Sequence, residues 1–191
     1  MADEFRVTST AFGNDGRIPR KHTADGAGAQ HDMSPPLQWH NVPEETESLA
    51  IICEDVSESP DSTVPFVHWV VVNIPPTLKG LPQGFHHKDV EGQKEYGDIQ
   101  EGVNDFKVPG YRGPSPPTGE QRIEFRVYAL DSKMNLGKKA TKEKLVEAME
   151  GHILAETMLV GHYAGNEKDD KGGFTSARGP MDGQSLYNNL Q

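Results

Sequence analysis

One apolar run, residues 65–75 with the sequence PFVHWVVVNIP, constrains the fold of this 191-residue chain most. β-Branched and aromatic residues dominate the run and prolines bound it, a pattern typical of a buried β-strand. His68 lies near the start of this expected strand. The core would hold its backbone in place while the ring still faces the rim, so His68 is well placed to contact a ligand.

Three other segments also have strand patterns. Residues 48–55 (SLAIICED) predict a second buried strand that ends on two acids, and residues 5–9 predict a short edge strand. Residues 122–130 alternate strictly between apolar and polar positions, which predicts a half-buried antiparallel strand. These segments favour a sheet-based core.

Helical signals are confined to the last third of the chain. Thr141 is a suitable N-cap for a short amphipathic helix. We expect Gly151 to end it, a second helical piece over residues 153–159, and a last strand over residues 159–163. The long Gly- and Pro-rich stretches 13–36 and 75–121 predict loops, which at this length tend to be functional. The order predicts a mainly β fold, an antiparallel β-sandwich with a few short peripheral helices near the C-terminus.

Composition narrows the class of protein. The formal net charge is −10, from 29 acidic and 19 basic residues, which argues against non-specific nucleic-acid binding. Cys53 is the only cysteine, so no intramolecular disulfide forms, and no stretch approaches the ~18 apolar residues of a membrane span. The N-terminus lacks the basic start and apolar core of a signal peptide. We expect a cytoplasmic protein with one domain over residues 1–163 and a polar, Gly-rich, mobile tail over residues 164–191.

Asp55 and His68 form the first candidate site. They close and open two consecutive strands, and they meet at one rim if those strands are neighbours. A carboxylate fixes the tautomer of an imidazole and raises its affinity for protons. The paired ring then donates well to a phosphate or carboxylate. An ordinary strand-end pair without any ligand is the alternative interpretation.

The segment 108–119, VPGYRGPSPPTG, is the second candidate. Its prolines stiffen the backbone and its glycines allow a ligand to approach closely. Tyr111 adds an amphipathic ring. The alternatives are a rigid surface loop and a proline-rich docking segment.

Catalytic and metal patterns are weak. His86 and His87 are adjacent, so in an extended chain their side chains point apart, and we expect no metal site there. A hydrolytic triad would combine Asp55 and His68 with Ser57 or Ser115, but no Gly-x-Ser-x-Gly elbow supports it. We therefore expect neither a cofactor nor an enzymatic activity.

Several of these motifs occur together in the order of a known family. They are SPPLQW at 34–39, the strand ending at Asp55, HWVVVNIP at 68–75, GYRGPSPP at 110–117 and YALD at 128–131. Over roughly residues 5–163 the chain resembles the phosphatidylethanolamine-binding proteins, also called Raf-kinase-inhibitor-like proteins. It looks closest to their small branch in bacteria and plants. The resemblance implies an antiparallel β-sandwich with a small anion pocket at one rim.

The resemblance also assigns roles and reveals departures. Asp55 matches the first acid of the family's Asp-Pro-Asp-x-Pro motif, and His68 matches the pocket histidine. Ser57 replaces the second acid, and Gln121 replaces the histidine that usually begins the alternating strand, so the anion should bind more weakly or differ in kind. The expected ligand-binding residues are Asp55, Ser57, His68, Gly110, Tyr111, Pro114, Ser115, Pro116 and Gln121.

The resemblance implies a non-enzymatic binding protein for phosphate-bearing small molecules or phospholipid head groups. Several family members regulate a kinase or another protein by direct contact. The alternative is a protein-interaction module with a vestigial pocket, which would use the proline segment and the acidic surface. The sequence leaves both a monomer and a homodimer open.

Overall fold

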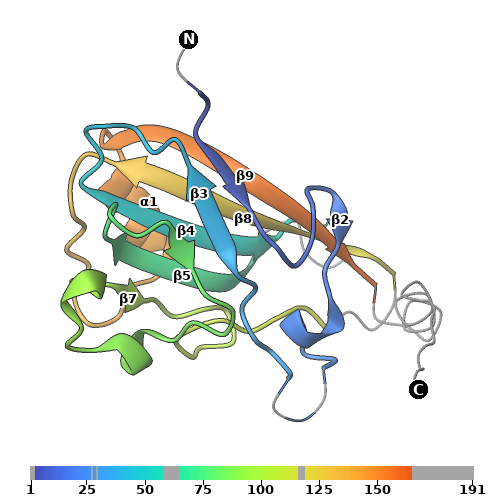
Figure 1. Ribbon diagram of the computed structural model, residues 1–191. Coiled ribbons are helices and arrows are strands. Elements are labelled where there is room, and N and C mark those ends of the chain that lie inside the picture. Colours follow the sequence, from blue (N-terminus) through green and yellow to red (C-terminus); the bar gives the residue numbers. More distant parts are fainter. Residues whose placement is uncertain (1–2, 27, 29, 58–64, 116–118, 165–191) are drawn as a thin grey trace.

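Two β-sheets form the body of the protein in a computed structural model, which describes residues 3–26, 28, 30–57, 65–115 and 119–164 (Figure 1). The strands are β1 (Arg6–Thr8), β2 (Gly16–Arg17), β3 (Leu37–His40), β4 (Ser48–Asp55), β5 (Phe66–Ile74), β6 (Gly80–Leu81), β7 (Gln100–Glu101), β8 (Gln121–Leu130) and β9 (Ile153–Tyr163). The helices are α1 (Lys142–Met149) and the 3-10 helices η1 (Arg20–His22), η2 (His87–Val90) and η3 (Lys94–Tyr96).

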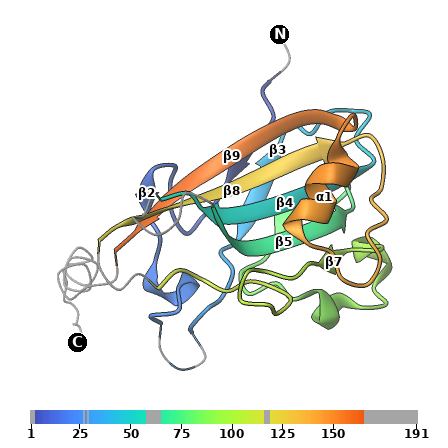
Figure 2. The same ribbon diagram turned by 180° about the vertical axis from the view of Figure 1, so that it is seen from behind.

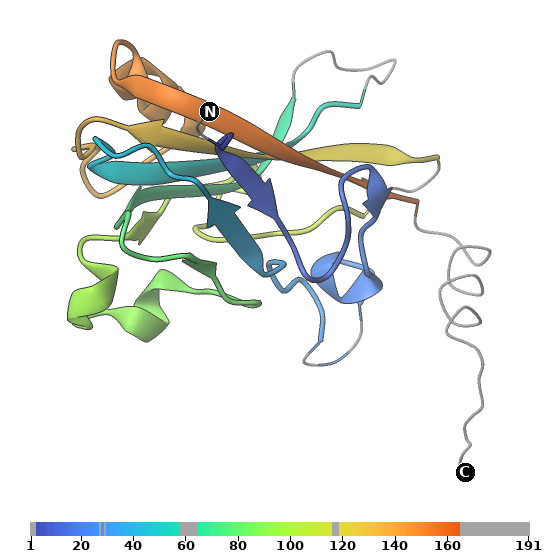
Figure 3. The same ribbon diagram turned by 45° about the horizontal axis from the view of Figure 1, so that its top comes forward.

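The larger sheet has the order β2-β9-β8-β4-β5-β7, and the smaller one has the order β1-β3-β6. The four long strands of the larger sheet, β9, β8, β4 and β5, are antiparallel to their neighbours. The two-residue β2 pairs parallel to β9 at the edge of that sheet. Figure 3 shows β1 and β3 as a second layer that crosses this sheet. Every residue of β4 is buried because strands flank it on both sides and both of its faces are covered.

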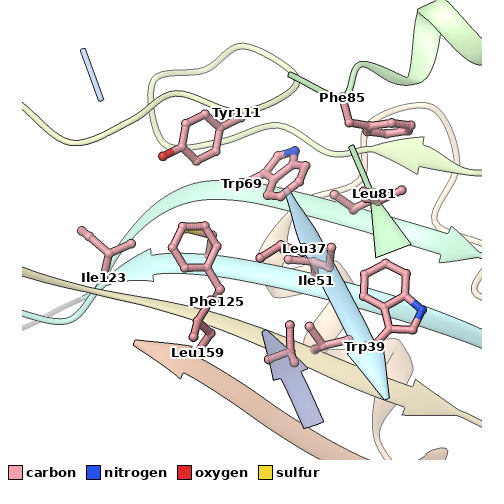
Figure 4. Packing of buried hydrophobic residues seen from close by; sticks show 14 of the residues in the cluster. Leu37, Trp39, Ile51, Trp69, Leu81, Phe85, Tyr111, Ile123, Phe125 and Leu159 are labelled. Carbon is pink, nitrogen blue, oxygen red and sulfur yellow. The ribbon is translucent and has the colours of Figure 1, made fainter. Parts of the chain in front are cut away.

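The main core lies between the two sheets. Leu37 and Trp39 of β3 pack toward Ile51 of β4 and Trp69 of β5, with Tyr111 above them (Figure 4). A second cluster covers the opposite face of the large sheet, where α1 lies across the strands (Figure 2). Leu145 of the helix is fully buried there because its apolar stripe faces the sheet. The fold is thus mainly β with two packed sheets, as the sequence predicts.

The expected strands over residues 5–9, 48–55, 65–75 and 122–130 are confirmed as β1, β4, β5 and β8. The first helix is also confirmed, and the Thr141 hydroxyl caps it by accepting from the Lys144 amide. The second helical piece over residues 153–159 is wrong, because this segment is the first part of β9. It pairs with β8 along nearly the whole length of that strand, which satisfies the backbone groups of both.

Parts of the long loops carry short elements that the sequence does not reveal, namely β2, β6, β7 and the three 3-10 helices. The strand β3, which directly follows the first loop, is also not revealed. The tail expected over residues 164–191 lies outside the described residues from position 165 onward and stays a prediction. In the described ranges, no helix is both long and apolar enough to cross a bilayer.

Candidate functional site

His68 occupies a break in the ladder between β4 and β5. The pairing moves from Cys53↔Trp69 to Glu54↔Val67, so His68 is the extra residue of a β-bulge. A bulge leaves one residue outside the ladder and turns its side chain in a new direction, and it is common beside functional sites. His68 is nevertheless only 3% exposed. The fold therefore presents a buried imidazole at the end of the sheet.

Arg112 fixes the orientation of this imidazole with its backbone. The His68 ring atom Nδ1 lies 2.6 Å from the Arg112 carbonyl oxygen, and the Arg112 amide donates to the His68 carbonyl at 3.1 Å. A carbonyl only accepts, so Nδ1 must carry the proton. The other ring nitrogen, Nε2, is buried and has no hydrogen-bond partner in the described part of the chain. In a neutral ring this atom is an acceptor.

Burial lowers the pKa of His68 below its ordinary value. The Arg112 carbonyl and the charges of Asp55, Asp32 and Asp105 oppose this effect without overcoming it. The sequence predicted that Asp55 fixes the tautomer and makes the ring a good donor. The first part is wrong, because a backbone carbonyl fixes the tautomer. The charge of Asp55 does raise the pKa of His68, as predicted, but desolvation outweighs it.

Asp55 instead joins Ser57 and Gln121 at the same end of the sheet. Its Oδ1 accepts from the Ser57 amide at 2.8 Å, and its Oδ2 accepts a short hydrogen bond from Gln121 Nε2. The Ser57 hydroxyl accepts from the Arg122 amide at 2.7 Å. The remaining amide oxygen, Gln121 Oε1, is buried and unpartnered among the described residues. Asp55, His68 and Gln121 thus lie at the same end of the sheet, where His68 Nε2 and Gln121 Oε1 are two acceptors without a partner among the described residues.

The proline segment is more embedded than a pocket lining would require. Tyr111 is buried, its hydroxyl donates to the His22 carbonyl at 2.6 Å, and burial raises its pKa well above the ordinary value. Gly110 lies beside the Glu101 carboxylate. The Pro114 carbonyl accepts from the Ala24 amide at 3.0 Å.

Ser115, the next residue of that segment, is exposed, and its hydroxyl donates to Asp25 at 3.2 Å. Pro116 lies outside the described residues. The ligand-binding roles assigned to Gly110, Tyr111, Pro114, Ser115 and Pro116 therefore remain predictions.

Three residues that the sequence did not single out surround the imidazole. The rings of Phe66 and Phe106 lie 5.2 and 6.0 Å from the His68 ring and 4.9 Å from each other, measured between centroids. They are 37% and 44% exposed, which is unusual for phenylalanine. The Arg112 guanidinium lies 5.2 Å from the Phe106 ring and 3.3 Å from Asp32. Phe66, Phe106 and Arg112 form an aromatic and cationic surface, here called the aromatic rim.

A family model described as phosphatidylethanolamine-binding protein matches residues 8–164. The chain belongs to the phosphatidylethanolamine-binding protein family. A UPF0098 protein of Methanothermobacter thermautotrophicus is 45% identical over 159 residues, which cover 83% of this chain and 98% of the relative. A UPF0098 protein of Chlamydia trachomatis is 37% identical over 167 residues, which cover 86% of this chain and 100% of the relative.

Solved structures agree with this family membership. A putative phosphatidylethanolamine-binding protein homologue from Chlamydia trachomatis superimposes with a TM-score of 0.73 at 34% identity, covering 85% of this chain and 98% of its own. YbcL from E. coli, described as a new member of the mammalian family, gives a TM-score of 0.73 at 29% identity, with coverages of 86% and 100%. The two-sheet fold of this chain is therefore the family fold.

The expectation that His86 and His87 point apart is wrong. His86 is extended, but the 3-10 helix η2 begins at His87, so the chain turns between the two residues. Both Nδ1 atoms lie near one oxygen of the Glu101 carboxylate.

Proposed function

We propose that this family member is a non-enzymatic, cytoplasmic binding protein for phosphate-bearing small molecules or phospholipid head groups. The ligand binds at the end of the large sheet, where β4 ends and β5 and β8 begin. One observation carries the proposal: His68 Nε2 is buried and unpartnered in the described part of the chain, while Nδ1 is fixed by the Arg112 carbonyl. A buried polar atom of this kind normally has a partner, and a bound ligand supplies one.

The acceptors of the site restrict which ligands fit. Neutral His68 offers a lone pair at Nε2, and Gln121 offers a second at Oε1. Three acids, Asp32, Asp55 and Asp105, also act on the imidazole. An anion that brings only acceptors must bind together with a proton on His68. A hydrogen phosphate brings a hydroxyl, and phosphoethanolamine brings an ammonium group, so both carry donors that match the site.

A hydrolase is less compatible with this arrangement. It would need a hydroxyl nucleophile within hydrogen-bond reach of the base. The Ser57 hydroxyl accepts from the Arg122 amide, and the Ser115 hydroxyl donates to Asp25. In the described part of the chain neither hydroxyl is hydrogen-bonded to His68 Nε2, which supports a binding role.

Calorimetric titration with inorganic phosphate and with phosphoethanolamine tests the proposal, alongside NMR of the His68 ring. His68→Gln keeps an N–H for the Arg112 carbonyl but lacks the second ring nitrogen. We expect it to weaken binding at least tenfold, the loss of one charge-assisted hydrogen bond. His152→Gln is the matched control, because His152 is a surface histidine paired with Asp131 at 2.8 Å. If neither ligand moves the His68 resonances and His68→Gln binds as wild type does, the proposal is wrong.

The exposure of Phe66 and Phe106 specifically favours a second candidate function. Exposed aromatic rings with an arginine packed on one of them are typical of the energetic centre of a protein interface. In this alternative the aromatic rim contacts a protein, such as a kinase that the chain regulates, and the anion pocket is vestigial. A partner whose binding is lost in Phe106→Ala but kept in His68→Gln would support it.

A further inference from the structure

A second polar cluster lies at the edge of the large sheet, on the β7 side. Glu101 Oε1 is 3.2 Å from His86 Nδ1 and 3.0 Å from His87 Nδ1. All three atoms lie within 4.8 Å of one another. The Glu101 side chain is fully buried, whereas those of His86 and His87 are 46% and 23% exposed. The cluster therefore has a buried carboxylate at its base and an opening toward solvent at the histidines.

Two of the three separations match the ligand shell of a small tetrahedral ion. Bonds of about 2.0–2.1 Å place neighbouring ligand atoms roughly 3.3 Å apart. The two Nδ1–Oε1 distances already fall close to this value. His86 is half exposed, so its ring can adjust to complete the nitrogen–nitrogen spacing without disturbing the core. Little rearrangement separates this geometry from a coordinated ion.

The ligand types select the class of metal. Two imidazoles and one carboxylate are a ligand set of zinc sites that keep one position open. Magnesium and calcium prefer shells made of oxygen atoms, so they fit this cluster poorly. The local charge is also compatible with a cation, since Lys88 is offset by Asp89 and Glu91 in the same segment.

Groups around the carboxylate hold it in place. The buried Trp69 indole donates to Glu101 Oε2 at 2.7 Å, and the His87 amide donates to Oε1 at 3.0 Å. Gly110 packs against the same carboxylate, and a Cβ at that position would lie 3.6 Å from Oε2. Such outer partners orient metal ligands and commonly contribute about 10–100-fold in affinity. The cluster therefore has a supporting shell as well as ligands.

We propose that His86, His87 and Glu101 bind one divalent transition-metal ion of the zinc class through the two Nδ1 atoms and a Glu101 oxygen. Water or a small anion completes the coordination at the solvent side. The ion joins η2 to β7 and, through Trp69, to the strand that carries His68. In the alternative arrangement, both imidazoles keep a proton on Nδ1 and donate it to the carboxylate.

Titration of the tag-free, chelator-treated full chain with zinc chloride separates the two arrangements. We expect one high-affinity zinc ion per chain, and we expect Co²⁺ to give the intense visible absorption of a tetrahedral centre. His86→Ala removes a half-exposed ligand, so the fold should persist, which circular dichroism checks. This variant should lose at least about tenfold in zinc affinity and most of the Co²⁺ absorption. Trp69→Phe, which removes the supporting N–H, should lose about 10–100-fold.

His152→Ala is the control, because it removes an equally exposed histidine that pairs with a single carboxylate. It should bind zinc as wild type does. The proposal is overturned if wild type binds no stoichiometric zinc. It is also overturned if His86→Ala and His152→Ala bind zinc with the same affinity as wild type, or if both lose affinity equally.

Discussion

We expect sulfate binding at the proposed site to depend on pH through the ionisation of His68. Sulfate carries acceptor oxygens and no proton across the neutral range, so it cannot pair with the Nε2 lone pair of a neutral ring. Burial lowers the pKa of His68 in the free protein. A bound dianion beside Nε2 raises that pKa again, because it stabilises the charged ring. Sulfate must therefore bind together with one proton, and its affinity increases as the pH falls.

The magnitude follows from the one proton that the His68 ring takes up. Gln121 does not ionise. The His68 Nδ1 keeps its proton, and donates it to the Arg112 carbonyl, in both the neutral and the charged ring. Between the lowered pKa of the free protein and the raised pKa of the complex, each pH unit changes the binding free energy by about 1.4 kcal/mol, or tenfold in affinity. Below the free-state pKa, which lies under the ordinary value of about 6.5, the affinity should level off.

Isothermal titration calorimetry with sulfate between about pH 5 and 8, in two buffers of different ionisation enthalpy, measures both the affinity and the protons taken up. At pH values between the pKa of His68 in the free protein and its pKa in the complex, we expect an uptake approaching one proton per bound sulfate. His68→Gln keeps an N–H but does not titrate, so its weaker affinity should not vary with pH. A flat affinity in wild type, or a slope that survives in His68→Gln, would refute the role given to this proton.

Two further predictions concern the scaffold of the site. A Cβ on Gly113 would lie 2.5 Å from the His22 carbonyl oxygen, so Gly113→Ala should move the segment that holds His68 and destabilise the protein by about 1–3 kcal/mol in urea denaturation. Gly13→Ala, where a Cβ meets nothing within 4 Å, should be nearly neutral, and equal losses would contradict this account. Leu145→Ala should cost about 2–5 kcal/mol, because it leaves a cavity beneath α1. Val146→Ala on the exposed side of the helix should stay within about 0.5 kcal/mol, and a loss comparable to that of Leu145→Ala would falsify the packing of α1.

The sequence predicts the strands whose local signal agrees with their final environment. β4 and β5 are buried apolar runs, and β8 alternates, so composition and periodicity suffice for them. β9 fails this test because Leu154, Ala155, Glu156 and Met158 are good helix formers. Its conformation is decided by the free edge of β8, a partner more than 20 residues away in sequence. Long-range pairing of this kind overrides local propensity and leaves little trace in the segment itself.

The same limit applies to the site. The rim with Asp55 and His68 follows from two strand ends, and Gln121 joins them as expected. The bulge at His68 depends on the register between β4 and β5. No residue in either strand predicts that register. Phe106 and Arg112 reach the imidazole only because of the path of a long loop. The sequence favours an extended chain at His86 and His87, and it does not reveal that η2 begins between them.

Two replacements explain why we expect one proton to govern binding at the proposed site. In the family pattern a second acid and a histidine occupy the positions of Ser57 and Gln121, and each adds an ionisable group. Here Ser57 accepts a backbone amide, and Gln121 donates to Asp55 while leaving a neutral acceptor unused. Protonation of His68 at Nε2 therefore converts this atom from a hydrogen-bond acceptor to a donor. A ligand that carries its own donor should therefore bind this protein across the neutral range, whereas a bare anion should bind it only as the pH falls.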